Sequence, residues 1–127
     1  MPHLVDTDIL VDYQRRNAEA LNYLAELGDW SYSVATEMEL VAGARNRDEI
    51  AAIVHTLYPY RKLPLTPETG ELASNIMKEY SGSSGMDPLD AIIAASALSE
   101  GLILSTRNRK HFTGIPGLEI EAPDYDL

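Results

Sequence analysis

The sequence contains no cysteine, and this absence removes several classes of protein. Without thiols there is no disulfide framework, no thiolate zinc site and no cysteine nucleophile. Nothing in the composition therefore points to an oxidising compartment. The cytoplasm is the expected location.

Long apolar runs are missing as well. Asp6 interrupts the residues that follow Met1, so we expect no secretory leader, and no stretch approaches the roughly 20 apolar residues of a membrane span. A chain of 127 residues can form one hydrophobic core but is too short for two ordinary domains. We therefore expect a single domain over residues 1–127 with no membrane anchor.

Basic residues are scarce. The chain has ten Lys and Arg against twenty Asp and Glu, which gives a net charge of −10 at pH 7. Nucleic-acid binding that ignores sequence requires a basic surface that releases counterions, so we do not expect it here. A polyanion would have to bind where cations gather locally, as Arg107, Arg109 and Lys110 do.

The clearest local signals predict a helix and then a strand in the last third of the chain. Asp87 suits a helix N-cap, Pro88 the first helical position and Asp90 the third. Gly101 suits the end of this helix. Residues 102–104 are apolar on both faces, which is typical of strands in parallel sheets covered by helices. The polar and basic loop that follows would lie at the carboxyl end of the strand, where open α/β sheets bind ligands.

Two earlier acids are also associated with predicted strands. Asp6 ends a short apolar strand over residues 3–6. A strand over residues 30–34 is followed by Thr-x-x-Glu, in which Thr36 is expected to cap a helix and Glu39 to lie in its first turn. The alternation of strands and helices predicts an α/β fold with a parallel, doubly wound sheet.

The other elements are predicted from similar signals. A helix over residues 18–27 is expected to bury Leu21, Leu24 and Ala25. Further expected elements are a first helix capped by Thr7 or Asp8, helices over 48–58 and from 67 onwards, strands over 62–65 and 118–122, and a flexible loop over 81–85.

Asp6, Glu39 and Asp90 thus occupy equivalent places near the carboxyl ends of strands. Each alone is explained as a capping or loop acid. Together, carboxylates crowded at one sheet edge would repel one another unless a cation neutralised them, and hard oxygen ligands suit Mg²⁺ or Mn²⁺. The other acids nearby are expected to have structural roles: Asp87 as N-cap, Asp8 as cap or outer hydrogen-bond acceptor, and Asp12. Structural roles are also expected for His3, His55 and His111, because they lack the spacing of zinc ligands.

Three motifs in this order resemble those of PIN-domain ribonucleases, specifically the VapC-type toxins of toxin–antitoxin pairs. LVDTDILVDY is similar to the first motif, with Asp6 as its acid, and SVATEMELVAGAR to the second, with Glu39 and Gly43 in Glu-x-x-x-Gly spacing. DPLDAIIAASALSEGLILSTRNRKHF is similar to the third motif and the strand after it, with Asp90 as the acid. Residues 106–108 stand at the fourth motif, so the resemblance covers nearly the whole chain.

The resemblance implies a three-layer fold in which a five-stranded parallel sheet of order 3-2-1-4-5 has helices on both faces. That order places Asp6 beside the 105–111 loop at the topological switch point. The resemblance also implies a homodimer, a VapB-type antitoxin that blocks the site, and Mg²⁺- or Mn²⁺-dependent cleavage of a specific structured RNA (tRNA or rRNA), which inhibits translation. Family members often carry Asp where this chain has Asn108, which leaves the number of bound metal ions open.

On this interpretation the acids hold a metal ion that lowers the pKa of a bound water. The expected metal ligands are Asp6, Glu39 and Asp90, and Asn108 is the fourth expected catalytic residue. The residues expected to bind RNA are Thr106, Arg107, Arg109 and Lys110.

Other functions fit less of the sequence. Asp6-Thr7-Asp8 also resembles the start of an Asp-x-Asp phosphatase motif, but Leu10 breaks that motif. A phospho-receiver domain needs an isolated Asp after the third strand, where Leu65-Thr66 stands. A PIN-like fold kept only as a binding module stays open, because Asn108 is neutral.

Overall fold

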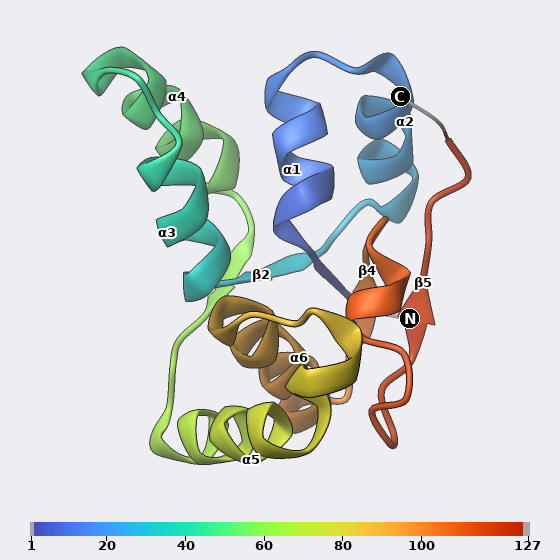
Figure 1. The fold of residues 1–127 in the computed structure, drawn as a ribbon. Helices are drawn as coiled ribbons and strands as arrows, with labels where there is room; N and C mark the ends of the chain where they lie inside the picture. Colours follow the sequence, from blue (N-terminus) through green and yellow to red (C-terminus); the bar gives the residue numbers. More distant parts are fainter. Residues whose placement is uncertain (1, 126–127) are drawn as a thin grey trace.

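A parallel sheet runs through the middle of the molecule (Figure 1). The computed structural model describes residues 2–125. In spatial order the five strands are β3 (Arg61–Leu63), β2 (Ser31–Ser33), β1 (His3–Val5), β4 (Ile103–Ser105) and β5 (Ile120–Glu121). Each neighbouring pair is parallel, so the predicted fold class and strand order are confirmed.

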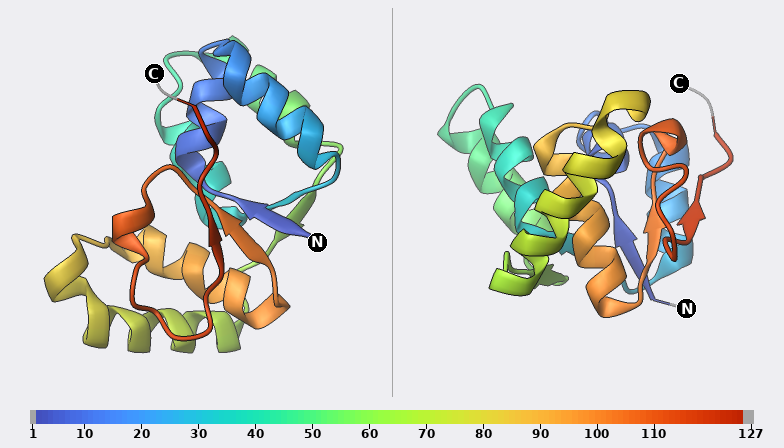
Figure 2. Two further views of the ribbon diagram at one scale, coloured as in Figure 1. Left: turned by 90° about the vertical axis from the view of Figure 1, so that its right-hand side faces the viewer. Right: turned by 60° about the horizontal axis from the view of Figure 1, so that its bottom comes forward.

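Helices cover both faces of this sheet. Within residues 2–125 they are α1 (Thr7–Gln14), α2 (Ala18–Leu27), α3 (Val34–Ala42), α4 (Arg47–Leu57), α5 (Pro67–Ser84) and α6 (Pro88–Glu100), with a short 3₁₀ helix, η1 (Arg109–His111). The left view of Figure 2 shows the sheet between a layer that contains α1, α2 and α4 and a layer that contains α5 and α6. In the described part of the chain, no helix has the length and apolar character needed to cross a membrane.

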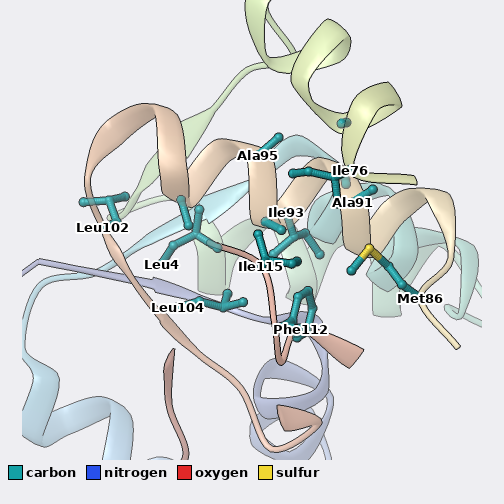
Figure 3. Packing of buried hydrophobic residues seen from close by; sticks show 14 of the residues in the cluster. Leu4, Ile76, Met86, Ala91, Ile93, Ala95, Leu102, Leu104, Phe112 and Ile115 are labelled. Carbon is teal, nitrogen blue, oxygen red and sulfur yellow. The ribbon is translucent and has the colours of Figure 1, made fainter. Parts of the chain in front are cut away.

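Each face of the sheet has its own hydrophobic core, because successive residues of a strand point to opposite sides. Leu4 of β1 lies in the core that also contains Leu104 of β4 and Ile93 of α6 (Figure 3). Val5 lies in the opposite core with Ile9 of α1. All five side chains are fully buried. Truncating such a leucine to alanine typically costs about 2–5 kcal/mol, so β1 and β4 are firmly held in place.

The helix predicted from Pro88 is present as α6, with the predicted caps. Asp87 Oδ1 accepts a hydrogen bond from the Asp90 amide at 2.9 Å, and Asp90 Oδ2 accepts one from the Asp87 amide at 3.3 Å. The helix ends at Gly101, which has a left-handed φ of 65°. The capping box and both helix ends are therefore confirmed.

The predicted cap of α3 is wrong. Ser33, the last residue of β2, is the N-cap, and its Oγ accepts a hydrogen bond from the Ala35 amide at 3.0 Å. This buried hydroxyl satisfies the helix terminus three residues before Thr36 could do so. Thr36 consequently lies in the first turn, and Glu39 lies in the second turn rather than the first.

The flexible loop predicted over residues 81–85 is also wrong, because α5 continues to Ser84. The Ser84 hydroxyl donates to the Tyr80 carbonyl at 2.9 Å, and Tyr80 packs against the core below α6. Gly85 then ends the helix with a φ of 73°. Tertiary packing has thus extended the helix through a sequence with low helix propensity.

Helix α2 has the predicted bounds but presents a different face to the core. Ala20 and Leu24 are buried, whereas Leu21 and Ala25 are exposed. Tyr23, on the inner side, hydrogen-bonds toward β4 and β5, which fixes the rotation of the helix. The predicted strands over 62–65 and 118–122 are shorter in the structure, the former because Pro64 has no amide hydrogen to donate.

Candidate active site

The candidate site lies where β1 and β4 meet, the point at which the strand order reverses. Asp6 follows β1, and its amide donates to the Ser105 carbonyl of β4 at 2.9 Å. Its carboxylate accepts hydrogen bonds from the Thr7 amide at 2.8 Å and from Thr106 Oγ1 at 2.7 Å. Asp6, rather than Thr7 or Asp8, is therefore the N-cap of α1. The predicted proximity of Asp6 and the loop after β4 is confirmed.

Asp8 adds a second carboxylate to this edge of the sheet. Its Oδ2 atom accepts a hydrogen bond from the Arg107 amide at 3.0 Å, and Thr106 Oγ1 lies 3.4 Å away. Its Oδ1 atom is buried and has no hydrogen-bond partner among residues 2–125. From the sequence, Asp8 was expected to be a cap or an outer hydrogen-bond acceptor. The Asp-x-Asp spacing is the signal that could have placed it next to Asp6.

Glu39 reaches the site from the second turn of α3. Its Oε1 atom lies 2.7 Å from Thr7 Oγ1, which in turn lies 3.0 Å from Thr36 Oγ1. Since a hydroxyl has one proton, Thr7 donates to the carboxylate and accepts from Thr36. Thr7 therefore links the first turn of α1 to the acid of α3.

Asp90 reaches the site from the first turn of α6. Its Oδ2 atom lies 3.1 Å from His111 Nδ1, and the side-chain Nδ2 of Asn108 lies 2.8 Å from the same ring atom. The backbone amide of Asn108 donates to Thr106 Oγ1 at 3.0 Å. The loop after β4 thus contacts both Asp6 and Asp90. A structural role was expected for His111 from the sequence, and no spacing signal indicated its contact with Asp90.

The site disfavours its own negative charge. Burial, aided by the charge of Asp8, raises the pKa of Asp6 to about 7, although hydrogen bonds from Thr106 and Thr7 oppose the rise. Burial is also the main cause of the raised pKa values of Asp8, Glu39 and Asp90. For Glu39, the charges of Asp87, Asp90 and Asp8 add to the effect of burial. A cation would compensate this repulsion.

The donor set fits a hard divalent cation, although the side chains do not form a closed cage. Within residues 2–125, no three His, Asp or Glu side chains are already arranged as a metal-binding group. The carboxylates are instead turned onto hydroxyl, amide and imidazole groups. Carboxylate and amide oxygens nevertheless suit Mg²⁺ or Mn²⁺, and the buried Asp8 Oδ1 atom without a partner is an available ligand.

The four residues predicted to bind RNA differ in accessibility. Arg109 and Lys110 are exposed at the start of η1. Thr106 is fully buried, with its hydroxyl on Asp6. The Arg107 side chain is 25% exposed and forms an ion pair with Asp12, in which Nε lies 2.8 Å from Oδ2. Only two of the four therefore present their side chains freely to solvent.

The fold and these acids match a known protein family. The model of the PIN domain family matches residues 3–117. The chain belongs to the PIN-domain family. Membership in it disfavours the phosphatase and receiver alternatives, whose motifs are also incomplete.

Individual relatives place this PIN domain more closely. Ribonuclease VapC19 of Mycobacterium tuberculosis is 31% identical over 121 residues, which are 91% of this chain and 96% of that protein. A chain of a toxin–antitoxin complex from Klebsiella pneumoniae has 30% identity and a TM-score of 0.83, over 98% of this chain and 99% of its own. A chain of DNA-bound VapBC from Salmonella typhimurium shares the fold, with a TM-score of 0.80 at 23% identity over 96% and 98% of the two chains. The resemblance to VapC-type PIN domains is confirmed.

A cleft of about 570 Å³ lies between α1, α3 and α4, and Glu39 is the acid of the candidate site that lines it. Glu39 and Gly43 lie on one wall, and Arg15 lies on the other. Gly43 has a φ of −84°, and a Cβ there would approach only the Glu39 and Leu40 carbonyls of its own helix, at 3.6 and 3.7 Å. Neither backbone conformation nor packing against another element requires glycine at this position, so the space beside Glu39 is open to a ligand.

Proposed function

We propose that this protein is a metal-dependent endoribonuclease, the toxin of a VapBC-type toxin–antitoxin pair. It would hydrolyse phosphodiester bonds in a specific structured RNA, a tRNA or rRNA, and so inhibit translation. The observation that carries the proposal is the placement of Asp6, Asp8, Glu39 and Asp90 at the switch point of a PIN domain, where Thr106, Thr7 and His111 contact three of these acids. Burial raises the pKa of all four carboxyl groups, and a cation would stabilise their charged forms.

The proposed metal is Mg²⁺ or Mn²⁺, held by Asp6, Glu39 and Asp90. When bound, such an ion supplies Lewis acidity and lowers the pKa of a coordinated water. The chain supplies orientation: Thr106 fixes the Asp6 carboxylate, and Thr7 fixes that of Glu39. Asp8, whose buried Oδ1 atom has no hydrogen-bond partner in the described part of the chain, could add a further ligand.

Asn108 stands where many family members have an acid. Its neutral amide can orient a water or offer one carbonyl oxygen, without adding a further negative charge. We therefore expect one tightly held ion in the absence of RNA. A second ion would bind once RNA phosphate oxygens are added.

Arg109 and Lys110 are the proposed phosphate contacts, because both are exposed on the loop that contacts Asp6 and Asp90. Thr106 was predicted from sequence to contact RNA, but it is fully buried. We therefore propose that it orients the Asp6 carboxylate instead. With this small basic footprint on an acidic chain, recognition would depend on the structure of the RNA rather than on charge alone.

The proposed partners follow from the relatives. One structural relative at 30% identity is part of a toxin–antitoxin complex, which supports a VapB-type antitoxin that covers the site. A homodimer is proposed as the assembly, in line with the sequence prediction. The cytoplasm, which contains tRNA and rRNA, is the compartment that this function requires.

Mapping of RNA 5′ ends tests the proposal. Purified protein would be incubated with total RNA and Mg²⁺ or Mn²⁺ at physiological salt, and new 5′ ends would be sequenced. The expected result is cleavage at one or a few positions in a structured RNA, survival of bulk RNA, and loss of cleavage with EDTA or in Asp6→Asn. If the parent binds RNA but cleaves it no faster than Asp6→Asn does, the binding-module alternative, which Asn108 leaves open, would be favoured.

A further inference from the structure

Arg107 attaches the loop after β4 to α1 at two points. Its backbone amide donates to Asp8 Oδ2 at 3.0 Å, and its side-chain Nε donates to Asp12 Oδ2 at 2.8 Å. Asp8 and Asp12 are one turn apart and therefore lie on the same face of the helix. Asp12 is 3% exposed, so the partner of the guanidinium is fixed inside the protein rather than mobile at its surface.

The C-terminal segment closes this contact from outside. The Tyr125 hydroxyl donates to the same Asp12 Oδ2 atom at 2.7 Å, and its ring lies 5.7 Å from the Arg107 guanidinium carbon. Pro123, two residues before, is buried and anchors the segment. Asp12 is thus shared by a residue of the site loop and a residue near the end of the chain.

The anchored loop also positions atoms of the proposed metal site. Thr106, which precedes Arg107, donates to Asp6, and the backbone amide of Asn108, which follows it, donates to Thr106. The next turn carries His111 to Asp90. A shift of the loop would therefore move the partners of both acids.

We propose that Tyr125, Asp12 and Arg107 form a latch that fixes the loop after β4 on α1 and so positions Asp6 and Asp90 for metal binding. The three are positioning residues, and Arg107 does not contact RNA phosphate. This inference rests on the proposed metal-dependent function. Loss of a group that orients metal ligands typically weakens metal affinity by about 10- to 100-fold.

Charge-altering variants distinguish the latch from simple electrostatics. Arg107→Met removes a positive charge beside an acidic site, so electrostatics alone would tighten Mn²⁺ binding. The latch requires the opposite, a weakening of about tenfold or more, measured by calorimetry without RNA. Tyr125→Phe changes no charge and retains the ring, and it should shift affinity in the same direction. Arg109→Met is the matched control, because it removes a nearby exposed cation that has no part in the latch.

A double-mutant cycle tests whether the members act together. Asp12→Asn and Arg107→Met should each weaken Mn²⁺ binding, and the double variant should be no weaker than the worse single variant. On a cleaved RNA, both should lower kcat and leave KM unchanged, whereas Arg109→Met should raise KM and leave Mn²⁺ affinity unchanged.

A phosphate-binding Arg107 would give a different pattern and would overturn the proposal. Asp12→Asn would then free the guanidinium and lower KM, while Arg107→Met would raise KM and leave metal affinity intact. Unchanged Mn²⁺ affinity in Tyr125→Phe and Arg107→Met would overturn it equally. Thermal melting without metal checks that each variant is folded, and Tyr125→Phe decides the matter if the buried substitutions unfold the protein. A parent that binds Mn²⁺ but cleaves no RNA would refute the proposed activity and leave the latch test valid.

Discussion

Asp6 experiences two opposing electrostatic effects. As the N-cap of α1 it accepts a hydrogen bond from the Thr7 amide, which favours its charged form. Burial at 4% exposure and the neighbouring charge of Asp8 favour the neutral form, and these effects dominate. A carboxyl group that is buried and surrounded by acids is poorly suited to stabilising a fold, which is the physical reason to assign it to a cation.

The raised pKa of Asp6 predicts how the metal-free protein responds to pH. Its pKa is about 7 in the folded protein, against an ordinary value of 3.8 that applies to the unfolded chain. At a pH between these two values, the folded state therefore binds more protons than the unfolded state. The derivative of the unfolding free energy with pH is then negative, and stability should fall as pH rises from about 4 to about 7. Urea unfolding with EDTA across this range should show a steeper fall for the parent than for Asp6→Asn. Identical pH dependence in the two proteins would count against the buried, proton-holding carboxyl.

Helices α6, α3 and α5 show where local sequence decides structure and where it does not. The ends of α6 are predictable because Asp87, Asp90 and Gly101 act within their own segment. The start of α3 is not, because Ser33 is both the last residue of a strand and the cap of the next helix. The last turn of α5 is held by packing on α6, and its Ser- and Gly-rich sequence does not predict this packing.

Gly82 inside α5 and Gly85 at its C-cap give a matched test of that last turn. Gly82 lies inside the helix, and a Cβ there would meet nothing within 4 Å, so Gly82→Ala should stabilise the protein by about 0.5–1 kcal/mol. Gly85 has a φ of 73°, so Gly85→Ala should destabilise it by about 1 kcal/mol. Chemical denaturation measures both. Two near-neutral substitutions would indicate a flexible loop instead of a helix.

The whole molecule brings together groups that are far apart in the sequence. Thr106 meets Asp6, and Arg107 meets Asp12, across separations of 100 and 95 residues. The resemblance to PIN domains implied the strand order, and the motifs predicted that the main acids would meet, because parallel strands share a carboxyl edge. They did not predict which side chains pair there, because that depends on helix rotation and on the path of the C-terminal segment. Asp8, His111 and Tyr125 were missed for this reason.

A calorimetric titration with Mn²⁺ tests the metal site directly. It compares the parent protein with Asp90→Asn, both without RNA. Asn keeps the shape of the side chain and an oxygen for the cap on Asp87, but it lacks the negative charge. The parent should bind one ion tightly, and Asp90→Asn should bind it at least about tenfold more weakly, because a ligand carboxylate is lost. Equal affinity and stoichiometry in the two proteins would show that the ion does not bind among these acids and would contradict the account.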